Sequence, residues 1–101
     1  MDSVFSSLAD PTRRDILRRV TRSELTVGEI SADYDMSMAA VSKHIKMLER
    51  AMLVIKRRRG KEQLVSARTN ALAEAREYLE WYRQFMDGQL DSLEEFLNKE
   101  V

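Results

Sequence analysis

The sequence predicts a mainly α-helical fold that contains one small β-hairpin, and three features of its 101 residues support this prediction. Two short amphipathic segments follow each other closely between residues 26 and 50. A basic segment with a central glycine comes next, at about 54–67. A long segment without proline then runs from about 70 to 99, with apolar residues at seven-residue intervals. The periodic apolar residues of the first and last of these segments predict helices. The glycine-containing segment between them predicts a two-stranded hairpin.

The first helix that these residues predict begins at Asp10 and Pro11. An aspartate can cap free backbone N–H groups, and proline suits the first helical position. Ile16, Leu17 and Val20 follow with helical spacing. We therefore expect these three side chains to face inward.

The next helix begins at Thr26, because Thr26 and Glu29 form a T-x-x-E capping box. Three apolar side chains are expected to line one side of this short helix: Val27, Ile30 and Tyr34. A tight connection at Asp35-Met36 leads to a further helix over about 37–50, for which Ser37 is the expected cap. Two consecutive helices joined by a few residues form a helix-turn-helix pair.

The second helix of this pair has two different faces. The apolar face is formed by Val41, Ile45, Leu48 and Met52. The opposite face carries Ser42, Lys43, Lys46 and Arg50. Since an apolar stripe holds a helix against a core, the small and cationic side chains are left for base edges and phosphates in a DNA major groove. The alternative is an ordinary surface helix of an α-helical domain.

Basic residues continue into the predicted hairpin, so that residues 37–61 hold eight Lys or Arg against one Glu. Apolar pairs at 54–55 and 64–65 favour two strands, and Gly60 supplies a turn between them. Four cations of this wing are expected to reach backbone phosphates or a narrow minor groove: Arg57, Arg58, Arg59 and Lys61. The competing interpretation is a basic run that is only solvated.

The segment at about 70–99 predicts a helix of roughly 45 Å. Its heptad positions predict a dimer interface formed by Leu72, Leu79, Tyr82, Met86, Leu93 and Phe96. A small winged domain cannot cover so long a stripe, and we expect a second copy of the chain to cover it. Packing within one chain is one alternative, and a small-molecule pocket at Trp81, Tyr82 and Phe85 is another. Gly88 is expected to mark a bend or a close crossing with the partner.

Length and charge fit one domain, in which residues 1–67 form a DNA-binding core and residues 68–101 a dimerisation helix. The formal net charge is zero, but residues 1–67 carry +4 and residues 68–101 carry −4. This asymmetry indicates separate roles for the two segments. The absence of Cys excludes disulfides, Cys-ligated zinc and iron–sulfur clusters.

Neither membrane insertion nor catalysis is expected from these residues. No stretch approaches the roughly 18 apolar residues of a membrane span, and the first residues lack an apolar signal segment. Ser42, Lys43 and His44 are reactive types, but adjacent helical residues point about 100° apart and cannot converge on one substrate. We expect a soluble intracellular protein with no enzymatic activity and no cofactor.

Three segments resemble those of a known family: LADPTRRDILRRV at 8–20, LTVGEISADYDM at 25–36 and AAVSKHIKMLERAMLV at 39–54. They look like the second helix, the first helix of the DNA-binding pair and the recognition helix of the arsenic-repressor-like (ArsR-type) winged helix-turn-helix transcriptional regulators. The wing and the long last helix match in order and length. The resemblance implies the order α-α-α-α-β-β-α and a homodimer that pairs through its first and last helices. It also implies a cytoplasmic, nucleoid-associated protein of a bacterium or archaeon.

The sequence departs from the family's pattern in its metal ligands and in two turns. Metal-sensing members place a Cys pair near the helix at 26–29, or His and acidic residues on the last helix. This chain has neither, and its only histidine is His44, so it resembles the metal-independent branch. Met52 stands where the family commonly has Gly, and Tyr34 lies in a turn that usually holds a small residue.

The expected function is sequence-specific binding of double-stranded DNA as a dimeric repressor, at an inverted repeat. The recognition surface is predicted to comprise Ser37, Met38, Ala39, Ser42, Lys43, His44 and Lys46. Lys43 is the best candidate for guanine, while His44 is expected to touch a phosphate or to take part in local packing. Two other functions stay open: a protein-interaction module on the same scaffold, and a sequence-neutral nucleoid protein. An unknown small-molecule or protein effector is a further possible partner.

Overall fold

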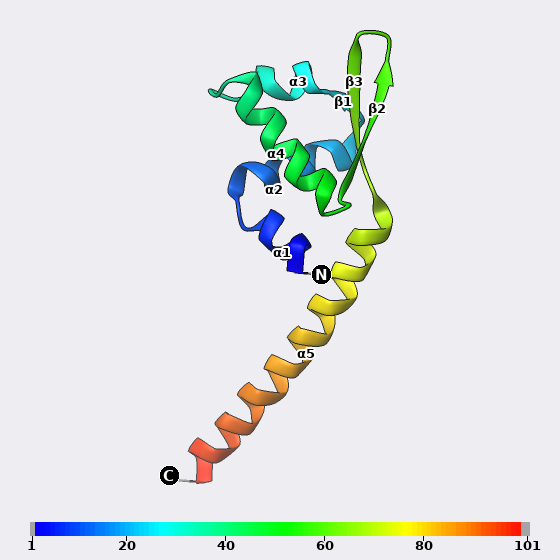
Figure 1. Cartoon of the computed structure of the whole chain (residues 1–101). Coiled ribbons are helices and arrows are strands. Elements are labelled where there is room, and N and C mark those ends of the chain that lie inside the picture. Colours follow the sequence, from blue (N-terminus) through cyan, green and yellow to red (C-terminus); the bar gives the residue numbers. More distant parts are fainter. Residues whose placement is uncertain (1, 100–101) are drawn as a thin grey trace.

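The computed structural model describes residues 2–99 and contains five helices and three strands within them (Figure 1). In chain order they are α1 (Asp2–Leu8), α2 (Pro11–Arg22), β1 (Leu25–Thr26), α3 (Val27–Ala32), α4 (Met38–Arg50), β2 (Val54–Arg59), β3 (Glu62–Ala67) and α5 (Thr69–Lys99). This order confirms the mainly helical fold with a basic hairpin. The two-residue strand β1 was not expected, because so short a segment carries no periodic signal.

Helix caps begin the helices where the sequence predicts them. One carboxylate oxygen of Asp10 accepts hydrogen bonds from the backbone N–H groups of Thr12 at 2.8 Å and Arg13 at 3.1 Å. The bond from Arg13 is the main reason why the pKa of Asp10 lies below its usual value. The capping box of α3 is complete, since Glu29 N–H and Thr26 Oγ1 lie 3.0 Å apart, as do Thr26 N–H and Glu29 Oε1.

The sheet is antiparallel with the strand order β1-β3-β2. Its wing is a hairpin in which Val54 pairs with Ala67 and Arg59 with Glu62. Gly60, the first of the two residues between the strands, has φ +62°, as in hairpin turns that require glycine at this position. Strand β1 adds Leu25 and Thr26 to the far edge of β3, next to Val65 and Leu64. The sheet therefore ties the wing to the start of α3.

A single core lies between α2, α3, α4 and the base of the sheet. Its fully buried large side chains are Ile16, Ile30, Val41, Ile45, Leu48, Leu53, Val54 and Val65. The predicted inward residues of α2, α3 and α4 are buried in this core or, like Val27 and Tyr34, partly buried against it, with one exception. Met52 was assigned to the apolar face of α4, and that assignment is wrong because Met52 lies outside the helix and is 54% exposed.

The end of α4 explains this difference. Met52 has φ +61°, its N–H donates to Glu49 O at 3.0 Å, and the N–H of Leu53 donates to Leu48 O at 3.0 Å. This is a Schellman motif, which reverses the chain and places the residue after the left-handed one against the helix. Leu53 therefore takes the buried position. A methionine adopts here the conformation that glycine adopts more easily.

Helix α5 leaves the body of the protein and gives it an elongated shape (Figure 1). The radius of gyration is 18.6 Å and the principal extents are 68 × 28 × 21 Å. A compact domain of this length would have a radius of gyration of about 13 Å. Only the start of α5 packs on the core, through Ala75 and the partly buried Leu72. The helix continues without interruption through Gly88, so this residue does not end it.

Helix α5 is long, but none of the helices in residues 2–99 combines the length and apolar character that crossing a membrane requires.

Candidate nucleic-acid interface

Helix α4 presents a polar face away from the core. Ser37 begins the helix, and its hydroxyl oxygen accepts from the N–H of Ala40 at 3.1 Å. Lys43 and Lys46 lie on the side opposite the buried face, and both are exposed. Among residues 2–99, neither lysine has an ion pair. Their charges are thus available to a ligand on this face.

The other predicted residues of α4 divide between its outer face and its two edges. Ala39 is exposed beside Lys43, while Met38 and Ser42 lie on the edge that faces the wing. His44 lies on the other edge, against α2, and is half-buried. The recognition surface predicted from the sequence is therefore one continuous strip, except that His44 is set back from it.

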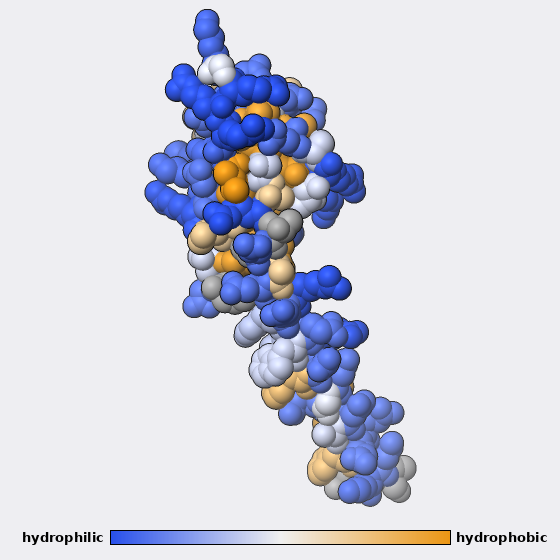
Figure 2. Space-filling model, turned by 90° about the vertical axis from the view of Figure 1, so that its right-hand side faces the viewer, coloured by the Kyte–Doolittle hydropathy of each residue, from blue (hydrophilic) through white to orange (hydrophobic). Residues whose placement is uncertain are grey.

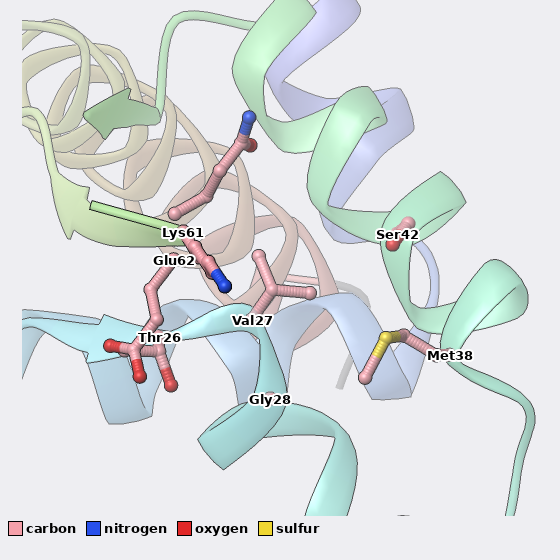
Figure 3. Close-up of a pocket in the computed structure, with 8 residues that line it drawn as sticks. Thr26, Val27, Gly28, Met38, Ser42, Lys61 and Glu62 are labelled. Atoms are coloured by element: carbon pink, nitrogen blue, oxygen red, sulfur yellow. The ribbon is translucent and has the colours of Figure 1, made fainter. Parts of the chain in front are cut away.

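A groove of about 380 Å³ separates α4 from the wing (Figure 3). It is lined by Thr26, Val27, Gly28, Met38, Ser42, Lys61, Glu62 and Gln63. In Figure 3, Met38 and Ser42 come from one wall, the start of α3 forms the floor, and Lys61 comes from the strand side. The groove thus joins predicted residues of α4 and of the wing. Five of the lining residues are not among the predicted site residues, because no charge or helical pattern marks their side chains as part of a basic surface: Thr26, Val27, Gly28, Glu62 and Gln63.

The four predicted cations of the wing differ in their partners. Arg57 forms an ion pair with Glu24 at 2.7 Å, and Arg59 lies 3.8 Å from Glu62. The Nε of Arg58 donates to the carbonyl of Gly60 at 3.2 Å. Within the described residues, Lys61 has neither an ion pair nor a side-chain hydrogen bond. Arg58 and Lys61 therefore keep their charges unneutralised at the turn of the wing.

Tyr34, in the turn between α3 and α4, is held by two residues of α2. Its hydroxyl donates to Asp15, and the guanidinium of Arg19 lies 5.4 Å from the centre of its ring. Arg19 also donates to the carboxylate of Asp33 at 2.7 Å and to the carbonyl of Ile30 at 3.2 Å. Burial raises the pKa of the Tyr34 hydroxyl, and the bond to Asp15 acts in the same direction. The large residue in this turn thus fixes α3 on α2.

The apolar side chains of α5 beyond Ala75 lie in solvent. Among the predicted interface residues, five are between 39% and 59% exposed: Leu79, Tyr82, Met86, Leu93 and Phe96. Figure 2 shows pale and tan atoms between blue ones along this helix. The sixth predicted residue, Leu72, instead packs against the core of its own chain.

A row of aromatic rings extends this exposed surface onto α1. Phe5 lies 5.5 Å from Tyr78, Tyr78 lies 6.0 Å from Trp81, and Trp81 is stacked on Phe85 at 5.7 Å, all between ring centres. We call these four residues, with the exposed apolar residues of α5, the apolar face. The residues alone did not predict the part played by Phe5, because α1 is too short to show a periodic pattern.

Comparisons with known proteins agree with this geometry. A family model described as a helix-turn-helix domain matches residues 8–57. The HTH-type transcriptional regulator Rv2034 of Mycobacterium tuberculosis is 36% identical over 98 residues, which cover 89% of this chain and 92% of that protein. The transcriptional repressor SdpR of Bacillus subtilis is 29% identical over 87 residues, which cover 86% and 93%. An ArsR-like transcriptional regulator from Rhodococcus sp. RHA1 has a similar structure, with a TM-score of 0.81 and 26% identity, covering 97% of this chain and 90% of that one.

Proposed function

This chain belongs to the ArsR-type winged helix-turn-helix transcriptional regulators, and from that premise we propose that it is a dimeric repressor of an inverted-repeat operator. It is a DNA-binding transcriptional regulator and not an enzyme. The observation that carries the proposal is the strip of exposed, unpaired lysines on α4 next to the basic wing. Such a strip fits a major groove, and the wing fits the backbone beside it.

In this proposal Lys43 reads guanine O6 or N7, and Ser42 bonds a base or a phosphate. Met38 and Ala39 contact thymine methyl groups. Lys46, Ser37 and His44 complete the surface, with His44 at a phosphate. The groove between α4 and the wing receives the DNA backbone that separates the major groove from the adjacent minor groove.

The wing cations have two different roles in the proposal. Arg58 and Lys61 supply phosphate contacts, because no carboxylate neutralises them in the described residues. Arg57 and Arg59 contact DNA less, because Glu24 and Glu62 already hold them. The Arg57–Glu24 pair instead joins the wing to the body, whereas the Arg59–Glu62 pair lies within the wing itself.

A second copy of the chain covers the apolar face in this proposal. The exposure of so many large apolar side chains on one helix supports it, since a monomer rarely leaves such a surface in water. Residues 1–67 then form the DNA-binding core and α5 the dimerisation helix. A two-fold axis would bring two α4 helices to successive major grooves about 34 Å apart.

Repression follows from occupying an operator, and the similarity to the transcriptional repressor SdpR supports that direction. The regulator would act in the cytoplasm of a bacterium or archaeon, on nucleoid DNA. Its activity follows from its abundance, because a dimer equilibrium governs DNA occupancy. A small-molecule or protein effector would act by shifting the same equilibrium.

The test is fluorescence anisotropy of the whole protein on DNA from upstream of its own gene and on a shuffled duplex, at two salt concentrations. We expect a preference of about 10³-fold or more for the upstream duplex. Equal binding that is lost in higher salt would indicate nucleoid coating. Binding to neither duplex would contradict a DNA-binding role and favour a protein-interaction module.

The variant Arg58→Ala tests the wing in the same experiment. It should weaken binding to both duplexes and reduce the salt slope by about one. Arg83→Ala is the matched control, because Arg83 lies on α5 in an ion pair with Glu80 at 2.8 Å. An unchanged affinity and slope for Arg58→Ala would contradict the wing assignment.

A further inference from the structure

We propose that Arg13 of α2 is a positioning residue for DNA binding, which couples the apolar face to the recognition helix α4. The proposal rests on the proposed function, because it takes α4 as the recognition helix and α1 as part of the dimer contact. The side chain of Arg13, on α2, forms hydrogen bonds with both α1 and α4.

The first part of this coupling is the end of α1. The Nε of Arg13 donates to the carbonyl of Ser7 at 2.6 Å, and one terminal nitrogen donates to the carbonyl of Ser6 at 3.3 Å. Carbonyls in the last turn of a helix have no partner within the helix, and a cation there also interacts favourably with the helix dipole. Since a helix of seven residues is not stable by itself, such contacts, together with the burial of Val4 in the core, fix where α1 lies.

The second part is a hydrogen bond to α4. The other terminal nitrogen of Arg13 lies 3.3 Å from Nδ1 of His44. Arginine has only donors, so Nδ1 has to be the acceptor, and the proton of the neutral ring is on Nε2. His44 then offers Nε2–H as its only donor. Because His44 lies at the edge of the recognition surface, this group is suited to a phosphate oxygen of the DNA backbone.

These contacts make a short path between two surfaces that the chain needs to coordinate. Phe5 of α1 contacts Tyr78 of α5 on the apolar face, and a carbonyl in the last turn of α1 accepts a hydrogen bond from Arg13. Arg13 in turn fixes the ring of His44 on α4. A second copy of the chain that displaces α1 when it binds the apolar face would therefore also displace α4 relative to the DNA.

Arg14 provides a matched control for the coupling. Its guanidinium donates to the carbonyl of Leu8 at 2.8 Å, so it also caps the end of α1. No hydrogen bond to α4 is found for Arg14 among residues 2–99. If Arg13 only caps α1, the variants Arg13→Gln and Arg14→Gln should behave alike.

The experiment is a double-mutant cycle of Arg13→Gln and His44→Phe in the whole protein. Binding to a fluorescein-labelled duplex from upstream of its own gene is measured by anisotropy, with the dimer constant measured by sedimentation equilibrium. We expect each variant to weaken binding about tenfold and the double variant to be no weaker than about the same tenfold, because contacting residues are not additive. Arg14→Gln should stay within about twofold of the wild type, as expected for a surface change.

Two outcomes would overturn this inference while leaving the proposed function intact. In the first, the losses of DNA affinity in the two single variants multiply in the double variant. The other is an equal loss in Arg13→Gln and Arg14→Gln. Failure of the wild type to bind the duplex would overturn the proposed function and this inference with it.

A measurement on the wild type tests the hydrogen bond without any variant, which keeps the inference open to refutation if Arg13→Gln does not fold. His44 is the only histidine of the chain, so its ring nitrogens give unambiguous nitrogen-15 NMR signals. We expect the proton on Nε2, with Nδ1 unprotonated. A neutral ring protonated on Nδ1 would exclude donation by Arg13 and overturn the proposal.

Discussion

The winged body, residues 2–68, and the distal part of α5, residues 78–99, differ in the burial of their apolar side chains. In the body, side chains such as Ile16, Leu48 and Val65 are fully buried against one another. In the distal part of α5, apolar side chains such as Trp81 and Leu93 are more than half exposed. The apolar residues of the body therefore pack against one another within one chain, whereas those of the distal helix are left exposed, as the proposed dimer requires.

Charge divides along the same boundary. Residues 1–67 carry a net +4 and residues 68–101 a net −4. The wing and the end of α5 lie at opposite ends of the molecule (Figure 1). The acidic helix is thus directed away from the surface proposed to meet phosphates, where its carboxylates would oppose binding.

The largest expected effect is on the body, through Leu48→Ala. Leu48 is fully buried under α4, and removing a buried leucine side chain leaves a cavity. We expect a loss of about 2–5 kcal/mol in the free energy of unfolding, measured by urea denaturation at fixed protein concentration. Gln84→Ala, on the exposed side of α5, should change it by less than about 0.5 kcal/mol. Similar losses of unfolding free energy in both variants would contradict the view that the buried core of the body, and not the exposed distal helix, stabilises the fold.

The second effect is on association, through Leu93→Glu. A charge in the middle of the apolar face should raise the dimer dissociation constant about 100-fold or more, because burying an unpaired carboxylate costs several kcal/mol. Sedimentation velocity over a dilution series measures the constant. Gln84→Glu adds the same charge on the opposite side of α5 and serves as the control. A dimer that persists in Leu93→Glu would mean that the apolar face has another role.

The two regions also differ in how far the sequence predicts them. The body follows from caps and periodicity, because Asp10, Thr26 and Glu29 act on neighbours a few residues away. What the sequence could not predict depends on long-range contacts. The burial of Leu53 in place of Met52 requires the chain reversal after α4, and the joining of Phe5 to Tyr78 requires the packing of two distant helices.

The candidate DNA site shows the same limit. Charge and helical spacing predict which cations of α4 are exposed. They do not predict that Glu24 holds Arg57, because these residues are far apart in the sequence and meet only through the sheet. Nor do they predict that Arg13 reaches His44.

Within the body, exposed cations should contribute to DNA binding rather than to folding. Lys43→Ala should weaken binding to the upstream duplex by about 1–3 kcal/mol and reduce its preference over the shuffled duplex. Anisotropy measures both quantities. Lys56→Ala is the matched control, since Lys56 is held by Glu49 at 3.4 Å, and it should have a smaller effect on preference. Equal effects would contradict the assignment of Lys43 to base contacts.

The smallest expected effect concerns acid stability. The hydrogen bond from the backbone N–H of Thr26 is the main cause that lowers the pKa of Glu29, and the Thr26 side chain acts in the same direction. A carboxyl whose pKa is lower in the folded state stabilises the protein above its unfolded value of 4.5 and loses that contribution as the pH falls through the folded value. Glu29→Gln should therefore reduce the dependence of the melting temperature on pH between about 5 and 3.

Glu80→Gln, on the distal helix, tests whether that dependence belongs to the body. Glu80 also has a lowered pKa, mainly because of its hydrogen bond with Arg83, but the pair is exposed on α5. Exposed ion pairs contribute little to stability, so this variant should alter the pH dependence less than Glu29→Gln does. If it altered the dependence more, the acid-sensitive contacts would lie in α5, and the capping box would not be the contact through which acid weakens the body.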